Sequence, residues 1–138
     1  MESKTFQIVG LPGSGKTTLV AKLNYKVYDI ADYSNLDWHQ RNKSILSCLK
    51  EAKEEIVIVE SVCGFPQLKS QGNVMVTIPL EETKRRLASY RGEAFDDLDL
   101  FYYQSMSQLT VPCDLILDGT MPIEANVEIL KNYISLHL

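Results

Sequence analysis

The sequence is poor in the residues that build metal centres and disulfide frameworks. It has three cysteines and two histidines among 138 residues, and Cys48, Cys63 and Cys113 form no C-x-x-C pair. A structural zinc site needs four Cys or His ligands at suitable spacing, and a disulfide framework needs paired cysteines. We therefore expect reduced thiols, and at Cys63 a small buried side chain rather than a nucleophile.

Long hydrophobic runs and an excess of positive charge are also absent. No apolar segment has the length of a membrane helix, and the charged first residues lead directly into a predicted strand. The formal net charge is -4, so the chain lacks the strong positive field with which many proteins bind nucleic acid. These absences predict a cytoplasmic protein with no membrane partner, and they leave only a local basic cleft for any nucleic acid.

The composition is that of a globular chain, 45% hydrophobic and 23% charged. Its length suits a single domain over residues 1–138, with little room for a second. Short β-rich segments alternate with helix-period segments. The strand segments are FQIVG, KVYDI, EIVIVE, NVMVTI and CDLILD, and the helical ones are 16–24, 36–53, 80–90, 97–109 and about 122–137. Strands that are apolar on both faces and joined by helices predict an α/β fold, a three-layer sandwich around a five-stranded parallel sheet.

Two of the predicted helices carry recurring, mainly apolar residues at helical spacing. The residues that recur in 36–53 are Ile45, Leu49 and Ala52, and those in 97–109 are Leu98, Phe101, Ser105 and Leu109. Tyr102 and Tyr103 are predicted to pack within the second of these helices.

The stretch GLPGSGKTT lies between the first predicted strand and the first predicted helix. It satisfies the pattern GxxxxGK[ST] in the strand-to-helix context that this phosphate-binding loop, the P-loop, requires. Backbone amides of such a loop surround phosphate oxygens at the positive end of the helix dipole. The predicted nucleotide-binding residues are Gly10, Pro12, Gly13, Ser14, Gly15, Lys16, Thr17 and Thr18.

Three residues of the sequence have the side chains that a magnesium nucleotide needs. Lys16 would contact the β and γ phosphates, and Thr17 would ligate magnesium. Glu60 ends the run IVIVE, where an acidic group can hold magnesium through water, although a strand-end residue facing solvent is the alternative. ATP and Mg²⁺ are the expected cofactors, while the loop alone leaves open GTP as donor and an inert nucleotide-binding role.

Missing motifs narrow the class further. The chain has no guanine-reading NKxD and no DxxG, because the third predicted strand ends in VESVCG. A regulatory GTPase needs both, and a motor core is much longer. A small kinase is therefore favoured.

Three longer stretches, GLPGSGKTT, PLEETKRRLASYRGE and DLILDGTMPIEANVEIL, are similar to the P-loop kinases of small metabolites and nucleotides over nearly the whole chain. The resemblance implies a nucleoside kinase-like fold whose basic helix forms a short lid over ATP, here around 86–96. VYDIADY, KRRLASYRG and DDLDLFYYQSM resemble polynucleotide 5′-hydroxyl kinases and DNA hydroxymethyluracil kinase-like proteins. Ser34 and VESVCGFP depart from that narrower pattern.

Phosphoryl transfer needs a carboxylate that takes the proton of the acceptor hydroxyl. Asp32, just past the second predicted strand, is the predicted base, with Asp29 in reserve and a turn or cap role as the alternative for Asp32. Trp38 and Arg41 follow where these kinases bind their acceptor. Trp38 could stack on a base or pack in the core. The predicted acceptor residues are thus Asp29, Asp32, Trp38 and Arg41.

Positive charge must neutralise the transferring phosphoryl group, and the predicted lid supplies it. Arg86 and Arg91 are the predicted catalytic arginines, together with Lys16 of the loop. The alternative is a solvated basic face paired with Glu81 and Glu82.

The predicted acceptor side is open, because the interval 31–55 is short and mostly one predicted helix. We therefore predict an ATP-dependent kinase acting on a hydroxyl of a nucleic acid or modified nucleotide, such as a hydroxymethylated base or a 5′ end in DNA. The alternatives are a small-molecule or nucleoside monophosphate kinase and a non-catalytic regulatory module. Acceptor identity and oligomeric state stay open at this point.

Overall fold

Strands and helices alternate along the chain in the computed structural model, which describes residues 3–30 and 37–138, with only the backbone of Trp38. The strands are β1 (Lys4–Val9), β2 (Lys26–Asp29), β3 (Ile56–Ser61), β4 (Gly72–Thr77) and β5 (Leu115–Asp118). The helices are α1 (Lys16–Ala21), α2 (Trp38–Glu51), α3 (Leu80–Arg91), α4 (Asp97–Leu109) and α5 (Ile123–Leu136). Each predicted strand and helix overlaps an observed one, with ends displaced by a few residues.

The strands form one sheet in the order β2-β3-β1-β4-β5, and every neighbouring pair is parallel. The predicted five-stranded parallel sheet is therefore confirmed. Parallel pairing brings the carboxyl ends of the strands to one edge, where Asp29 is in register with Glu60 and Val9 with Ser61. Ligands of such sheets bind beyond this edge.

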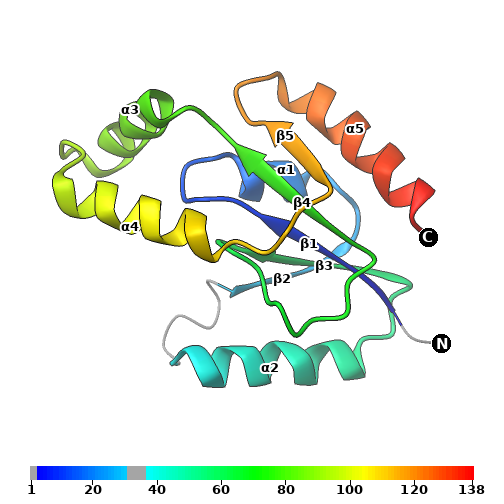
Figure 1. Ribbon diagram of the computed structural model, residues 1–138. Coiled ribbons are helices and arrows are strands. Elements are labelled where there is room, and N and C mark those ends of the chain that lie inside the picture. The colour runs from blue at the N-terminus through cyan, green and yellow to red at the C-terminus, as the bar shows by residue number, and fades with distance from the viewer. Residues whose placement is uncertain (1–2, 31–36) are drawn as a thin grey trace.

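Helices cover both faces of the sheet, as the three-layer prediction requires. Figure 1 shows α1 and α5 on one face, α2 on the other, and α3 and α4 beyond the carboxyl ends of the strands. The larger core cluster joins α1 and α5 to the sheet through residues that include Leu19, Leu130 and Phe6. A smaller cluster packs Ile45 of α2 against Val59.

Helix boundaries follow from local capping chemistry. The Asp37 side chain accepts a hydrogen bond from the Gln40 amide and starts α2, and Asp96 does the same for α4 with the Asp99 amide. Gly92 ends α3 in the left-handed conformation, with φ 70°. No helix in the described part of the chain is long and apolar enough to cross a membrane.

Helix α4 turns an apolar stripe toward solvent. Leu98, Phe101 and Leu109 are 79%, 71% and 62% exposed, whereas Tyr103 on the opposite face is 5% exposed. The predicted packing of Tyr103 is confirmed, while Tyr102 is only partly covered at 42% exposed. Helical spacing alone identified a face of α4 but not its direction, because this helix lies beyond the sheet edge and packs through a narrow strip around Tyr103.

Two leucines test this assignment of faces. Leu130→Ala on α5 removes a fully buried side chain and should lower the free energy of unfolding by about 2–5 kcal/mol. Leu98→Ala on α4 should change it by no more than about 0.5 kcal/mol, because its side chain is already in water. Urea unfolding of both variants measures the difference, and equal losses would contradict the fold as described.

Candidate functional site

The loop between β1 and α1 reverses sharply over the carboxyl end of the central strand. Gly13 and Gly15 have φ of 87° and 93°, a region that favours glycine. A Cβ on Gly10 would lie 2.6 Å from the Ser14 hydroxyl and 2.7 Å from the Val76 carbonyl oxygen. The glycines of the motif therefore let the loop fold back closely on β1 and β4.

Several amides of the loop have no acceptor within the described residues, among them those of Gly13, Gly15, Lys16 and Thr17. Unpaired amides at the start of a helix are ready donors to phosphate oxygens. Ser14 differs, because its amide donates to the Leu11 carbonyl at 3.1 Å, and its buried hydroxyl has no hydrogen-bond partner in the part of the chain that the structure describes. Of the predicted loop residues, Ser14 shapes the turn rather than offering a free amide.

Lys16 carries a buried ammonium at the floor of the loop. Its residue is 9% exposed, and it forms no hydrogen bond or ion pair with the residues that the structure describes. Burial lowers the pKa of Lys16, and the charges of Glu60 and Asp29 partly oppose that shift. An anionic ligand on the loop would supply the close counter-charge that the ammonium lacks.

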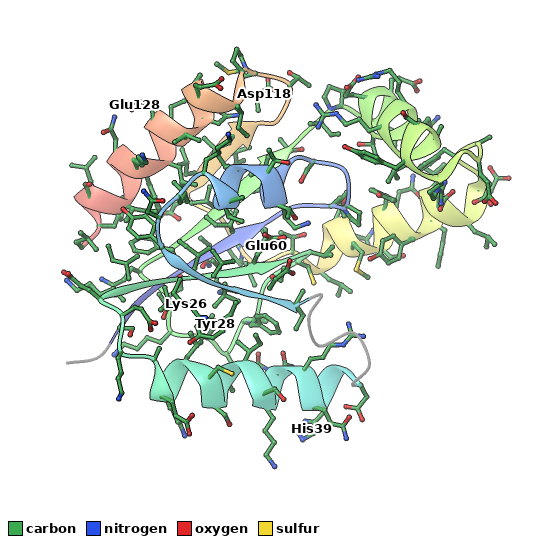
Figure 2. The ribbon with its side chains drawn as sticks, turned by 180° about the vertical axis from the view of Figure 1, so that it is seen from behind. Lys26, Tyr28, His39, Glu60, Asp118 and Glu128 are labelled. Atoms are coloured by element: carbon green, nitrogen blue, oxygen red, sulfur yellow. The ribbon has the colours of Figure 1, made fainter. Side chains whose placement is uncertain are left out.

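Thr17 in the first turn of α1 and Glu60 near the end of β3 are in direct contact. The Thr17 hydroxyl donates to Glu60 Oε2 at 2.6 Å, and Glu60 is 3% exposed, so the solvent-facing alternative for Glu60 is wrong. Burial raises the pKa of Glu60, the Thr17 hydrogen bond opposes this, and the neighbouring Asp29 adds to it. Figure 2 shows Glu60 near the centre of the molecule, beside α1.

The donor set around Thr17 fits a magnesium ion that is held mainly by a nucleotide. Hydroxyl and carboxylate oxygens are the hard ligands that Mg²⁺ prefers, and the ion usually keeps several waters and uses substrate phosphates. Among the described residues, no group of three or more Asp, Glu, His or Cys side chains gathers to hold a metal. Thr17 and Glu60 would therefore complete a coordination shell rather than supply all of it.

Arg86 of α3 reaches the loop. Its guanidinium donates to the Gly13 carbonyl at 3.0 Å and to the Gly119 carbonyl at 3.1 Å, and its Nε donates to Glu82 at 3.0 Å. Arg85 also bonds Glu82 but points to solvent, as the surface-pairing alternative predicted. Hydrogen bonds from Arg85 and then Arg86 lower the pKa of Glu82 to about 2. Glu82 thus orients the arginine that joins α3 to the loop.

Arg91 bonds a different partner. Both of its terminal nitrogens donate to the Asp99 carboxylate, at 2.9 and 2.8 Å, which ties the end of α3 to the first turn of α4. The predicted lid, 86–96, therefore comprises the last turns of α3 and the connection that this ion pair spans. A catalytic role for Arg91 stays a prediction that requires release from Asp99.

A cavity of about 200 Å³ opens between the loop, α3 and the segment after β5. Its lining includes Thr18 from α1, Arg86 and Tyr90 from α3, and Gly119 and Met121 beyond β5. Sequence reasoning gave no role to Tyr90, Gly119 or Met121. Gly119 and Met121 could have been found from the rule that ligands bind beyond the carboxyl ends of strands, since β5 ends at Asp118.

The predicted acceptor residues are only partly placed. Asp29 ends β2 in register with Glu60, and its charge acts on both Lys16 and Glu60. Arg41 lies in the first turn of α2, where its amide donates to the Asp37 carbonyl. Asp32 and the Trp38 side chain lie outside the described residues, so their roles stay predictions. His39 sits on the outer side of α2, exposed to solvent (Figure 2).

A parallel sheet in the order β2-β3-β1-β4-β5, with a GxxxxGK[ST] loop after its central strand, defines the fold class of the P-loop kinases. No protein-family model matches the chain, and no curated protein is recognisably similar to it in sequence.

Solved kinase structures share this fold over nearly the whole chain. Shikimate kinase from Bacteroides thetaiotaomicron is 20% identical with a TM-score of 0.64, covering 96% of this chain and 98% of that one. Shikimate kinase from Aquifex aeolicus is 18% identical with a TM-score of 0.61, covering 95% and 96%. The APS kinase of Mycobacterium tuberculosis, solved with AMPPNP and APS, is 14% identical with a TM-score of 0.62, covering 97% and 98%. At such identities the likeness concerns the fold.

The pairing of Glu82 with the two arginines predicts a pH-dependent contribution to stability. Because the pKa of folded Glu82 is lowered to about 2, its contribution is present above the unfolded value near 4.3 and is lost as pH falls through about 2. The melting temperature of Glu82→Gln should therefore lie below that of the wild type at pH 6, and the gap should close between about pH 4.5 and 2. The Arg91 pair with Asp99 titrates equally in both proteins and cancels. A gap that stays constant over this range would contradict the assignment.

Proposed function

We propose that the protein is an ATP-dependent phosphotransferase that transfers the γ-phosphoryl group of ATP to a hydroxyl of a small molecule. The observation that carries the proposal is the contact between Thr17 and Glu60 beside Asp29 and Lys16. A loop that only binds nucleotide needs no second carboxylate there, whereas magnesium-dependent transfer uses both an acidic group near the metal and a base. The named fold relatives are shikimate kinases and an APS kinase, which supports a small acceptor.

The donor half of the site follows from the loop. The free amides of Gly13, Gly15, Lys16 and Thr17 would bind phosphate oxygens, and the Lys16 ammonium would bind the β and γ phosphates. Thr17 and Glu60 would hold Mg²⁺, which supplies charge neutralisation between the phosphates when bound. The cavity of about 200 Å³ beside Thr18 and Arg86 lies where a nucleoside attached to those phosphates would extend.

The acceptor half would lie on the β2 and β3 side of Lys16. A carboxylate there would accept the hydroxyl proton, and Asp29 and Asp32 remain the two candidates. Arg41 and Trp38 would bind the acceptor. The lid around 86–96, with Arg86 and Arg91, would add positive charge as it closes.

A second candidate acceptor is a hydroxyl on a nucleic acid or modified nucleotide, such as a 5′ end or a hydroxymethylated base in DNA. The supporting observation is that, in the described residues between β2 and β3, the only regular element is α2. No inserted domain stands there to enclose a small acceptor. An open acceptor side favours a hydroxyl on a large molecule, whereas the fold relatives favour a small one.

The function is tested by incubating the protein with γ-labelled ATP and Mg²⁺. Separate reactions should contain small polyols and hydroxy acids, sugars, nucleotides, and DNA with and without hydroxymethyluracil. We expect label on a small hydroxyl compound. Label on DNA alone would favour the second candidate. Nucleotide binding without transfer to any acceptor would instead indicate a regulatory module.

Lys16→Ala should lower any transfer by at least about a hundredfold, because the variant lacks the cation that stabilises the transferring group. Lys22→Ala is the matched control, since Lys22 is an exposed lysine just after the same helix. Equal activity of the two variants would remove Lys16 from the mechanism.

The base is identified by comparing Asp29→Asn with Asp32→Asn. The variant that lacks the base should lose about 10²–10⁴-fold in kcat while keeping its dissociation constant for MgATP within a few-fold of the wild-type value. Rapid-quench kinetics and calorimetry measure the two quantities. If neither variant slows transfer, a carboxylate base at the end of β2 is wrong.

A further inference from the structure

Helix α4 is joined to the phosphate-binding loop by the side-chain hydroxyl of Tyr103. Tyr103 donates a hydrogen bond to the Pro12 carbonyl oxygen at 2.9 Å, although the two residues are far apart in the sequence. Tyr103 is 5% exposed, and its ring contacts Phe95 and Tyr102 with centroid distances of 5.6 Å each. The phenol is therefore held in place by packing before it reaches the loop.

The bond controls the orientation of a peptide group that would face the ligand. In a trans peptide unit the C=O and N–H point in opposite directions. Holding the Pro12 carbonyl toward α4 therefore turns the Gly13 amide away from α4, and this is one of the amides without an acceptor in the described residues. Arg86 fixes the next carbonyl, that of Gly13, in the same way. Two consecutive peptide units are thus oriented from outside the loop.

Close packing of α4 does not orient these peptide units, because a cavity lies between α4 and the loop. Its volume is about 100 Å³, and its lining includes Leu11, Pro12 and Ser14 of the loop, Ser107 of α4, and Thr110, which caps the end of α4. The hydroxyls of Ser107 and Thr110 donate to carbonyls of α4, those of Tyr103 and Met106, instead of reaching the loop. Between α4 and the loop, the phenol of Tyr103 therefore makes the direct polar contact.

We propose that Tyr103 is a positioning residue, which holds the loop in its phosphate-binding conformation before the nucleotide arrives. The inference rests on the proposed function only for the identity of the ligand, the triphosphate of ATP. Without the hydroxyl, the Pro12 carbonyl can rotate toward the phosphate side, where it would repel the phosphate and withdraw the Gly13 amide. Burial raises the pKa of Tyr103 to about 12, so the phenol stays a donor throughout the neutral range.

The test is Tyr103→Phe, with Tyr133→Phe as the matched control. Tyr133 is also buried and donates one hydrogen bond, to Asp114 Oδ2 at 2.6 Å, at the amino end of the sheet. Calorimetry should measure the dissociation constant of a non-hydrolysable ATP analogue with Mg²⁺, and urea unfolding should measure stability. Tyr133→Phe should lose at least as much stability as Tyr103→Phe, because its lost hydrogen bond is to a carboxylate and not to a carbonyl.

We expect only Tyr103→Phe to weaken nucleotide binding, by about threefold to tenfold, the range of one lost hydrogen bond. Its KM for ATP should rise by the same factor with kcat little changed. Hydrogen exchange of the Ser14 amide in the ligand-free protein should also be faster in this variant than in Tyr133→Phe. An unchanged dissociation constant, or an equal loss in both variants, would overturn the inference. A wild-type protein that binds no ATP analogue would instead overturn the proposed function.

Discussion

The hydrogen bond between Thr17 and Glu60 is the contact on which the site depends. It joins the first turn of α1 to the end of β3, and it exists because β1 and β3 run parallel in a register that brings their carboxyl ends level. The same register places Asp29 beside Glu60. A parallel sheet thus gathers at one edge three polar residues from separate segments of the chain.

The charged side chains of Lys16 and Glu60 are buried, and this burial lowers the stability of the ligand-free protein. Burial lowers the pKa of Lys16 and raises that of Glu60, so both charged forms are disfavoured in the ligand-free protein. Each group is partly compensated by the other, yet within the described residues they form no direct ion pair. Such strain in a few buried groups is typical of sites that acquire their missing partner from a ligand.

The fold could be predicted because its signals are local. Apolar runs bounded by turn residues located all five strands, and the glycine spacing of residues 10–17 located the loop. The position of Glu60 near the carboxyl end of the sheet could be predicted from its place at the end of the run IVIVE, while its role stays a prediction. These features depend on periodicity and on backbone geometry, which nearby residues determine.

The rest of the site depends on distant contacts that carry no local signal. Arg85, Arg86 and Arg91 lie on one basic helix, yet one faces solvent, one contacts Gly13 and one binds Asp99. The choice depends on how α3 approaches the loop and α4. The exposure of Leu98, Phe101 and Leu109 on α4 could not be predicted for the same reason. Helical spacing shows which residues share a face, but not whether that face contacts the core or the solvent.

Arg86 has a consequence for motion as well as for shape. Its guanidinium bonds the carbonyls of Gly13 and Gly119, so one side chain joins α3 to both walls of the cavity of about 200 Å³. Any molecule that enters there and draws the guanidinium to itself also loosens α3 from the loop. Thermodynamic coupling is reciprocal. An interaction that holds α3 against the loop must therefore change the affinity of the cavity for that molecule by the same factor by which the molecule changes the equilibrium of α3. Binding of a ligand in the cavity and release of α3 from the loop are therefore thermodynamically coupled.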